Sequence, residues 1–173
     1  MSATDLQTRL GRDAAADASL LQYHACEWPV LLSDLDVRRL IRGAAEAIST
    51  LTLPLWEARF PKDRTPARAL EAAAQCLRRG TDNARAHAVV LAKACTKART
   101  ASLGYTHRTA EAARGVALAA TQLGRPTALG SLSEAYGGVE DELVYQDAVA
   151  GIYGREVETR RRVLDVIRPI LLA

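Results

Sequence analysis

The chain has 173 residues, a length that suits one domain around a single hydrophobic core. Hydrophobic residues make up 49% and charged residues 25%, which excludes a mostly disordered chain. The 33 Ala, against one Phe and two Trp, favour closely packed helices over a sheet, which needs β-branched and aromatic residues. We therefore expect an all-α fold, a compact single-domain bundle of about seven or eight antiparallel or orthogonal helices.

Cysteine usage and hydropathy indicate where the protein resides. Cys26, Cys76 and Cys95 are odd in number and lack a C-x-x-C spacing, so they indicate neither a disulfide framework nor a zinc site. Free thiols suit a reducing compartment. The N-terminus has no signal-peptide pattern, and no run of about 18 apolar residues is present to span a membrane. We expect a cytoplasmic protein that contacts no membrane.

The chain begins with a segment, residues 1–16, that has no clear apolar stripe. We expect this segment to be frayed or to form a loose first helix, and residues 17–173 to form the single helical domain. Residues 17–28 predict a short helix that ends before Pro29, because the residue before a proline disfavours helical backbone. Apolar residues at helical spacing then predict helices over residues 34–51, 66–79, 83–102, 106–123 and 127–136, and a final stretch over 139–171 that breaks near Gly151–Gly154.

Proline and glycine predict where several of these helices start and stop. Pro54 is expected to end or kink the helix before it. Thr65 and Pro66 predict the N-cap and the first helical position of the next helix. Gly80 is expected to close that helix, and Gly137–Gly138 to stop the short helix that begins at residue 127.

Charge is divided unevenly along the chain. Residues 59–125 carry thirteen Lys and Arg against four Asp and Glu, a net charge of +9. Residues 126–154 carry five acidic and no basic residues, a net charge of −5. Either the two stretches face each other or form ordinary solvated surfaces, or one of them faces a charged partner.

Motifs typical of catalytic or metal sites are absent from the sequence. His24, His87 and His107 lack the Glu-x-x-His and H-E-x-x-H spacings of metal sites, and neither a phosphate-binding glycine loop nor G-x-S-x-G occurs. We therefore expect no enzyme activity, no catalytic residue, no cofactor and no bound metal. The arginines are not accompanied by a helix-turn-helix pattern or by interleaved aromatic residues, so we do not expect a nucleic-acid partner.

Four pieces of the chain, in order, carry a family resemblance. They are P-L-W-E-A-R-F-P-K-D-R-T-P-A-R-A-L-E-A-A (54–73), A-R-A-H-A-V-V-L-A-K-A-C-T-K-A-R (84–99), A-L-G-S-L-S-E-A-Y (128–136) and E-L-V-Y-Q (142–146). With them, residues 54–146 resemble a family of small helical bacterial immunity proteins attributed to polymorphic-toxin systems. Thr127 stands where the family has a His, and Tyr145 where it usually has a Trp. The matched residues of the first piece that we interpret as structural are Pro54, Trp56, Glu57, Pro61, Asp63, Arg64 and Pro66, with Thr65 inserted between the last two.

The resemblance implies a protein that binds a cognate bacterial toxin and blocks it by steric occlusion, with no catalytic residue to carry over. If the toxin is a nuclease, its cleft should be basic, and an acidic surface would complement it. The residues that we predict to bind the partner are Glu134, Glu140, Asp141, Glu142 and Asp147.

Two other functions stay open at this point. The basic stretch 59–125 would suit a helical adaptor that binds nucleic acid or an acidic protein. A pocket that holds His24 or His107 beside a carboxylate would instead indicate an unrecognised enzyme.

Overall fold

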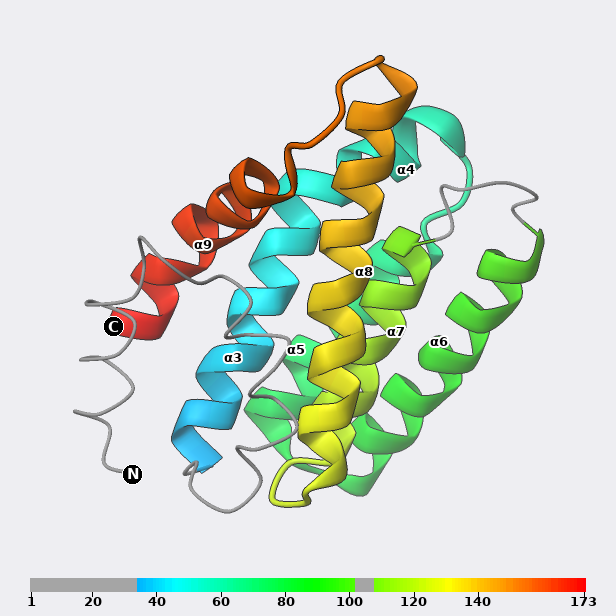
Figure 1. Cartoon of the computed structure of the whole chain (residues 1–173). Helices are drawn as coiled ribbons and strands as arrows, with labels where there is room; N and C mark the ends of the chain where they lie inside the picture. Colours follow the sequence, from blue (N-terminus) through cyan, green and yellow to red (C-terminus); the bar gives the residue numbers. More distant parts are fainter. Residues whose placement is uncertain (1–33, 102–107) are drawn as a thin grey trace.

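The computed structural model describes residues 34–101 and 108–173, which Figure 1 shows as helices and connecting loops. Helices account for 86% of these residues and no strand occurs among them, which confirms the all-α class. The N-terminal segment 1–16, the expected helix over 17–28 and the first residues of the helix expected over 106–123 lie outside the described residues.

The first described helix is long and bent. Helix α3 spans Asp34–Ala47 and continues through a π-helical turn, Ile48–Thr52, directly into α4, Leu53–Arg59. Pro54 lies at the start of α4, where its missing N–H is accommodated by the change of helical pitch. The bend expected at Pro54 is therefore confirmed.

The other helices are α5 (Thr65–Arg79), α6 (Asp82–Ala101), α7 (Arg108–Thr121), α8 (Thr127–Val149) and α9 (Glu156–Leu172). Because α3, the π-helical turn and α4 follow one another without a loop, we count them as one bent segment, and the described part of the chain then holds six helical segments. Within the described residues, the expected count of seven or eight is slightly too high. None of the described helices combines the length and the apolar character that crossing a bilayer requires.

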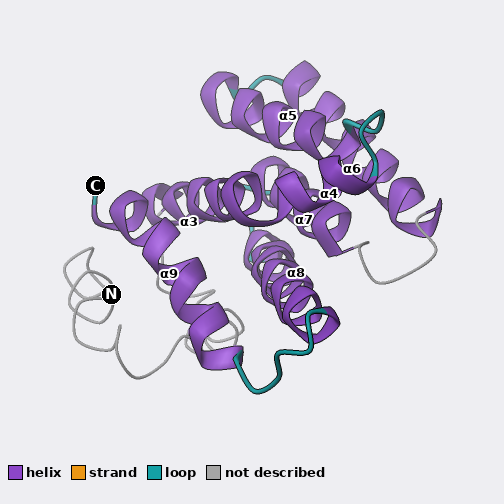
Figure 2. Cartoon of the chain, turned by 90° about the horizontal axis from the view of Figure 1, so that it is seen from above, coloured by secondary structure: helices purple, strands orange, loops and turns teal. Residues whose placement is uncertain are grey.

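Seen along the bundle, the helices form layers (Figure 2). Helices α5 and α6 make one outer layer, α3 and α7 lie in the middle, and α8 and α9 make the opposite outer layer. Helix α7 is central, because it packs against α5, α6 and α8 and also touches α3. The core therefore surrounds α7.

Small side chains let the other helices approach α7 closely. Nine of its fourteen residues are buried, and seven of those nine are Ala or Gly. A Cβ added at Gly115 would lie 2.5 Å from the Ser131 carbonyl oxygen and 2.9 Å from the Ala135 nitrogen on α8. The alanine-rich composition thus gives the closely packed helices that it predicts.

Helix α8 differs from its prediction at Gly137–Gly138, where the expected stop is wrong. The helix runs through both glycines to Val149. Gly138 is buried against α7, and a Cβ there would lie 3.1 Å from both the Ala112 Cβ and the Arg108 carbonyl oxygen. The close approach of α7 therefore favours a glycine at this point, and the packing outweighs the low helix propensity of that residue. The later break is confirmed, since Gly151 and Gly154 adopt φ angles of 76° and 74°.

The turn between α4 and α5 is held by residues of the first matched piece. Trp56 is 2% exposed, and its Nε1 donates to the Asp63 carbonyl oxygen at 2.9 Å. The Asp63 carboxylate accepts the Thr65 backbone N–H at 2.8 Å. The N-cap expected at Thr65 is wrong, because α5 begins at Thr65 itself, one residue before Pro66, and its N-cap is Arg64, whose side chain makes no capping bond. Asp63, the residue before the N-cap, binds the first N–H of the helix instead. These contacts give Trp56 and Asp63 a structural role.

Candidate partner-binding surface

The five acidic residues predicted to bind a partner all lie on α8, but they point to different sides of it. Glu134 and Asp141 are seven residues apart and share the side that faces α7. The Glu134 carboxylate lies 2.8 Å from the Arg114 guanidinium, and the Asp141 carboxylate lies 3.6 Å from Arg108. Both arginines belong to the basic stretch, so the two oppositely charged stretches partly neutralise each other within the fold.

Two further acidic residues are engaged inside the bundle. Glu140 pairs with Arg160 of α9 at 2.5 Å and is mostly buried. Glu142 is fully buried, and one of its oxygens accepts a hydrogen bond from the Gln146 amide at 2.9 Å. A partner that docks on this fold cannot reach Glu142. The five residues therefore do not form one acidic surface.

Asp147 is the member of the set that lies beside an unusual surface. The loop that follows it joins α8 to α9 and forms the end of the molecule that Figure 1 shows at the top, in orange. We call residues 147–158 the α8–α9 apex. Six large hydrophobic residues are exposed in the described part of the chain, and four of them lie at the apex: Val149, Ile152, Tyr153 and Val157.

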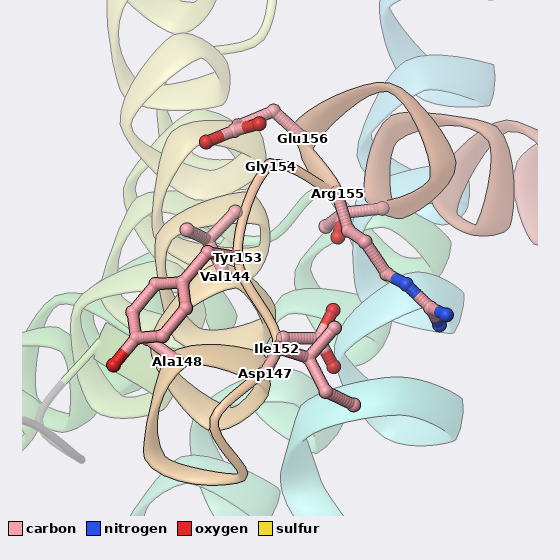
Figure 3. Close-up of a pocket in the computed structure, with 9 residues that line it drawn as sticks. Val144, Asp147, Ala148, Ile152, Tyr153, Gly154, Arg155 and Glu156 are labelled. Atoms are coloured by element: carbon pink, nitrogen blue, oxygen red, sulfur yellow. The ribbon is translucent and has the colours of Figure 1, made fainter.

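The apex residues project outward from a sharply turned loop. Gly151 and Gly154 supply its left-handed backbone positions, and the Ile152 N–H donates to the Asp147 carbonyl oxygen at 2.8 Å. Figure 3 shows Tyr153 and Arg155 extending to opposite sides of the loop. Tyr153 is 78% exposed, so its ring is available to a partner.

Charge around these apolar residues is mainly acidic. The charged residues of the apex are three acids, Asp147, Glu156 and Glu158, and one base, Arg155. None of the four takes part in an ion pair within the described residues. The apex thus combines an apolar centre with uncompensated negative charge. The sequence signal for it was the apolar pair Ile152–Tyr153 between two glycines, where a loop would normally be polar.

A small pocket lies within the apex, between the end of α8 and the start of α9 (Figure 3). Its volume is about 40 Å³, and Asp147, Tyr153 and Thr159 are among the residues that line it. This volume suits a water molecule and is too small for an organic cofactor.

A larger hollow is the open groove between α3 and α5, with a volume of about 600 Å³. Leu53 and Leu70 contribute apolar surface to it, and Arg64 and Glu71 lie 3.9 Å apart beside it. Because charges of both signs line this groove, it favours neither an acidic nor a basic partner.

Both cysteine thiols of the described residues, Cys76 and Cys95, are buried. Burial, with a smaller contribution from Asp63, raises the pKa of Cys95 to about 12, and burial also raises the pKa of Cys76. Such thiols are protonated near neutral pH and are poor nucleophiles. Among the residues that the structure describes, no group of three His, Cys, Asp or Glu side chains is placed to hold a metal ion. His24, Cys26 and His107 lie outside the described residues, and His87 is exposed on α6.

Comparisons with protein-family models, with curated proteins and with solved structures give no match to this chain. The resemblance of residues 54–146 to immunity proteins therefore stays a prediction from the sequence.

Proposed function

We propose that this protein binds and neutralises a bacterial toxin, and that the α8–α9 apex is the surface that makes the contact. The observation that carries the proposal is the clustering of four exposed apolar side chains at one end of the molecule. The other two exposed large hydrophobic residues, Leu35 and Val90, lie on different helices. Exposed apolar residues that cluster on a globular protein commonly mark a protein–protein interface.

Tyr153 is the side chain at the apex that is best suited to anchor a partner. Tyrosine is enriched among the residues that contribute most to protein–protein binding, because it buries a large ring and keeps a hydrogen-bonding hydroxyl. The surrounding loop is fixed between two packed helices, and the Glu140–Arg160 ion pair joins them. A surface ordered before binding loses less conformational entropy on association.

The charge of the apex indicates what kind of cleft it would cover. Asp147, Glu156 and Glu158 would attract a basic surface and increase the rate of association with it. Enzymes that cleave nucleic acids need such a basic surface to hold phosphates. A nuclease toxin, occluded sterically at its cleft, therefore agrees both with the apex and with the family resemblance of residues 54–146.

The direct test is to examine the neighbouring genes for a toxin domain, and to measure its binding to this chain together with rescue of growth on co-expression. Tyr153→Ala should weaken binding by about 2 kcal/mol, which is about thirtyfold in Kd. Val157→Ala should weaken binding too, whereas Val90→Ala should not. Val157 and Val90 are a matched pair, since they are 65% and 61% exposed and lie in opposite outer layers.

Charge is tested separately from apolar contact. The double variant Asp147→Lys, Glu156→Lys should lower the association rate and make that rate less dependent on salt. The dissociation rate should change less than the association rate. If the wild-type chain neither binds nor rescues, the toxin-neutralising function is wrong. If it rescues and the Tyr153 and Val157 variants bind as tightly as wild type, the function stands and the apex is the wrong surface.

A further inference from the structure

We infer that the outer face of the α5–α6 hairpin binds the phosphate backbone of a nucleic-acid duplex. This inference does not depend on the toxin, because it concerns a different surface in the opposite outer layer (Figure 2). The cations that form this surface, called the basic face below, are Arg68, Arg78, Arg79, Lys93 and Lys97.

These cations lie on the solvent side of both helices. On α5, Arg68 and Arg79 are three turns apart and lie opposite the buried Ala73 and Leu77. On α6, Lys93 and Lys97 are one turn apart, about 6 Å along the helix axis. Because α5 and α6 pack against each other and both pack against α7, the two rows lie on the exterior of one layer.

The fold leaves the basic face without compensating charge. All five side chains are exposed, and none of them forms an ion pair within the described residues. The nearby acidic residues, Glu71 and Asp82, are each next to another arginine, with Arg64 at 3.9 Å and Arg85 at 3.4 Å. The acidic residues of α8 do not neutralise the basic face, because α7 lies between α8 and the α5–α6 layer. Arg108 and Arg114 of α7 also pair with Asp141 and Glu134 of α8. The sequence alone did not show this separation, and it gave nucleic acid only as an alternative partner of the basic stretch 59–125.

The composition of the basic face favours a nucleic acid over an acidic protein. Protein–protein interfaces are enriched in aromatic residues and depleted in lysine. Neither α5 nor α6 contains Phe, Tyr or Trp, and two of the five cations are lysines. Interfaces with nucleic acids are strongly positive and polar, and most of their hydrogen bonds reach phosphate and sugar.

The same absence of aromatic residues favours a duplex over a single strand. Proteins that hold single strands stack the bases on aromatic side chains, which α5 and α6 do not offer. Two rows of cations on adjacent helices can instead contact the regularly spaced phosphates of a double helix. Such contacts would not read base sequence, because they reach only the backbone.

Fluorescence anisotropy with a labelled short duplex, DNA in one arm and RNA in the other, tests the inference on the full chain. With five phosphate contacts, log Kobs should fall against log salt with a slope of about −4.5, a loss of about 500-fold between about 50 and 200 mM salt. Lys93→Gln with Lys97→Gln should reduce the magnitude of that slope by about 1.8 and weaken binding at low salt. The arm that binds more tightly identifies the natural duplex.

A matched control removes the same charge elsewhere. Arg161 and Arg162 are exposed on α9, in the other outer layer, and changing both to Gln should leave the slope unchanged. Circular dichroism should show all variants folded, because every substituted side chain is exposed. Absence of binding to both duplexes at low salt would overturn the inference. So would equal losses from the α6 and α9 pairs, or binding to polyglutamate without binding to either duplex.

Discussion

The guanidinium of Arg114 on α7 lies 2.8 Å from the carboxylate of Glu134 on α8. This pair, together with Arg108–Asp141, joins the basic stretch of the chain to the acidic stretch that follows it. Of the interpretations that the charge pattern left open, the one in which the two stretches face each other therefore holds along the α7–α8 contact. The charge that remains for partners lies elsewhere, at the α8–α9 apex and on the basic face of α5 and α6.

The close contact of α7 with α8 predicts a strong effect of one added methyl group. Gly115→Ala would place a Cβ 2.5 Å from the Ser131 carbonyl oxygen, so the helices must move apart. We expect the free energy of unfolding, measured by urea denaturation, to fall by about 1–3 kcal/mol. The control is Gly130→Ala on α8, where the added Cβ has nothing within 4 Å. That change should stabilise the helix by about 0.5–1 kcal/mol, and equal effects at the two positions would contradict the contact.

Adjacent acidic residues on α8 should respond differently to charge reversal. Glu142→Lys would place an ammonium group where the native carboxylate is fully buried, and we expect a loss of about 3–5 kcal/mol in unfolding free energy. Asp141→Lys changes a side chain that is 54% exposed and should cost about 1 kcal/mol or less. Thermal unfolding of the two variants measures the difference. Similar melting temperatures would mean that Glu142 is accessible to solvent.

The α4–α5 turn predicts a role for the Asp63 carboxylate in stability. Asp63→Ala removes the acceptor of the Thr65 N–H and should lower the unfolding free energy by about 0.5–2 kcal/mol. Asp63→Asn retains an acceptor oxygen at the same position and should keep most of that stability. If both variants lose the same amount, the carboxylate charge rather than the capping bond stabilises the turn.

Alkaline pH should destabilise the fold through its buried thiols. The unfolded thiol of Cys95 ionises around pH 9.0, whereas burial holds its pKa at about 12 in the folded protein. The folded state then binds more protons than the unfolded state, so the unfolding free energy falls as the pH rises from 9.0 toward 12. Burial raises the pKa of Cys76 in the same direction.

Denaturation at a series of pH values measures this decline. In the double variant Cys76→Ala, Cys95→Ala the decline just above pH 9.0 should be smaller, although the variant is less stable at neutral pH. Tyr136 contributes only at higher pH, because its unfolded pKa is near 10.0 and burial raises it in the fold. An unchanged slope in the double variant would show that other groups cause the alkaline loss.

Much of the fold follows from local sequence, with instructive exceptions. The helical spacing of Val37, Leu40, Ile41, Ala44 and Ile48 correctly predicts the buried side of α3 and its π-helical turn, whereas Leu51, the last residue of the same stripe, is only partly buried. Gly137–Gly138 misleads, because the low helix propensity of glycine is a local property, whereas the need for a small residue at Gly138 arises from α7. A single chain read in order contains no information about that contact.

The candidate site was harder to predict than the fold. Asp147 was included among the predicted residues, but Tyr153 and the other apolar residues of the apex were not. Charge along the chain indicated an acidic partner-binding stretch, and helical geometry then distributed its members over separate sides of α8. Exposure of an apolar loop residue depends on what the rest of the chain leaves uncovered, and the sequence does not show this.

The sequence by itself determined that the described part of this protein is helical and where most of its helices end, because alanine, glycine and proline act on the backbone of their own neighbours. Only the tertiary structure decided which charges are available. The pairing of Arg108 and Arg114 with α8, the burial of Glu142 and the exposure of Tyr153 all depend on which helices lie side by side. A helical period fixes a residue relative to its own axis, and packing alone decides what that residue faces.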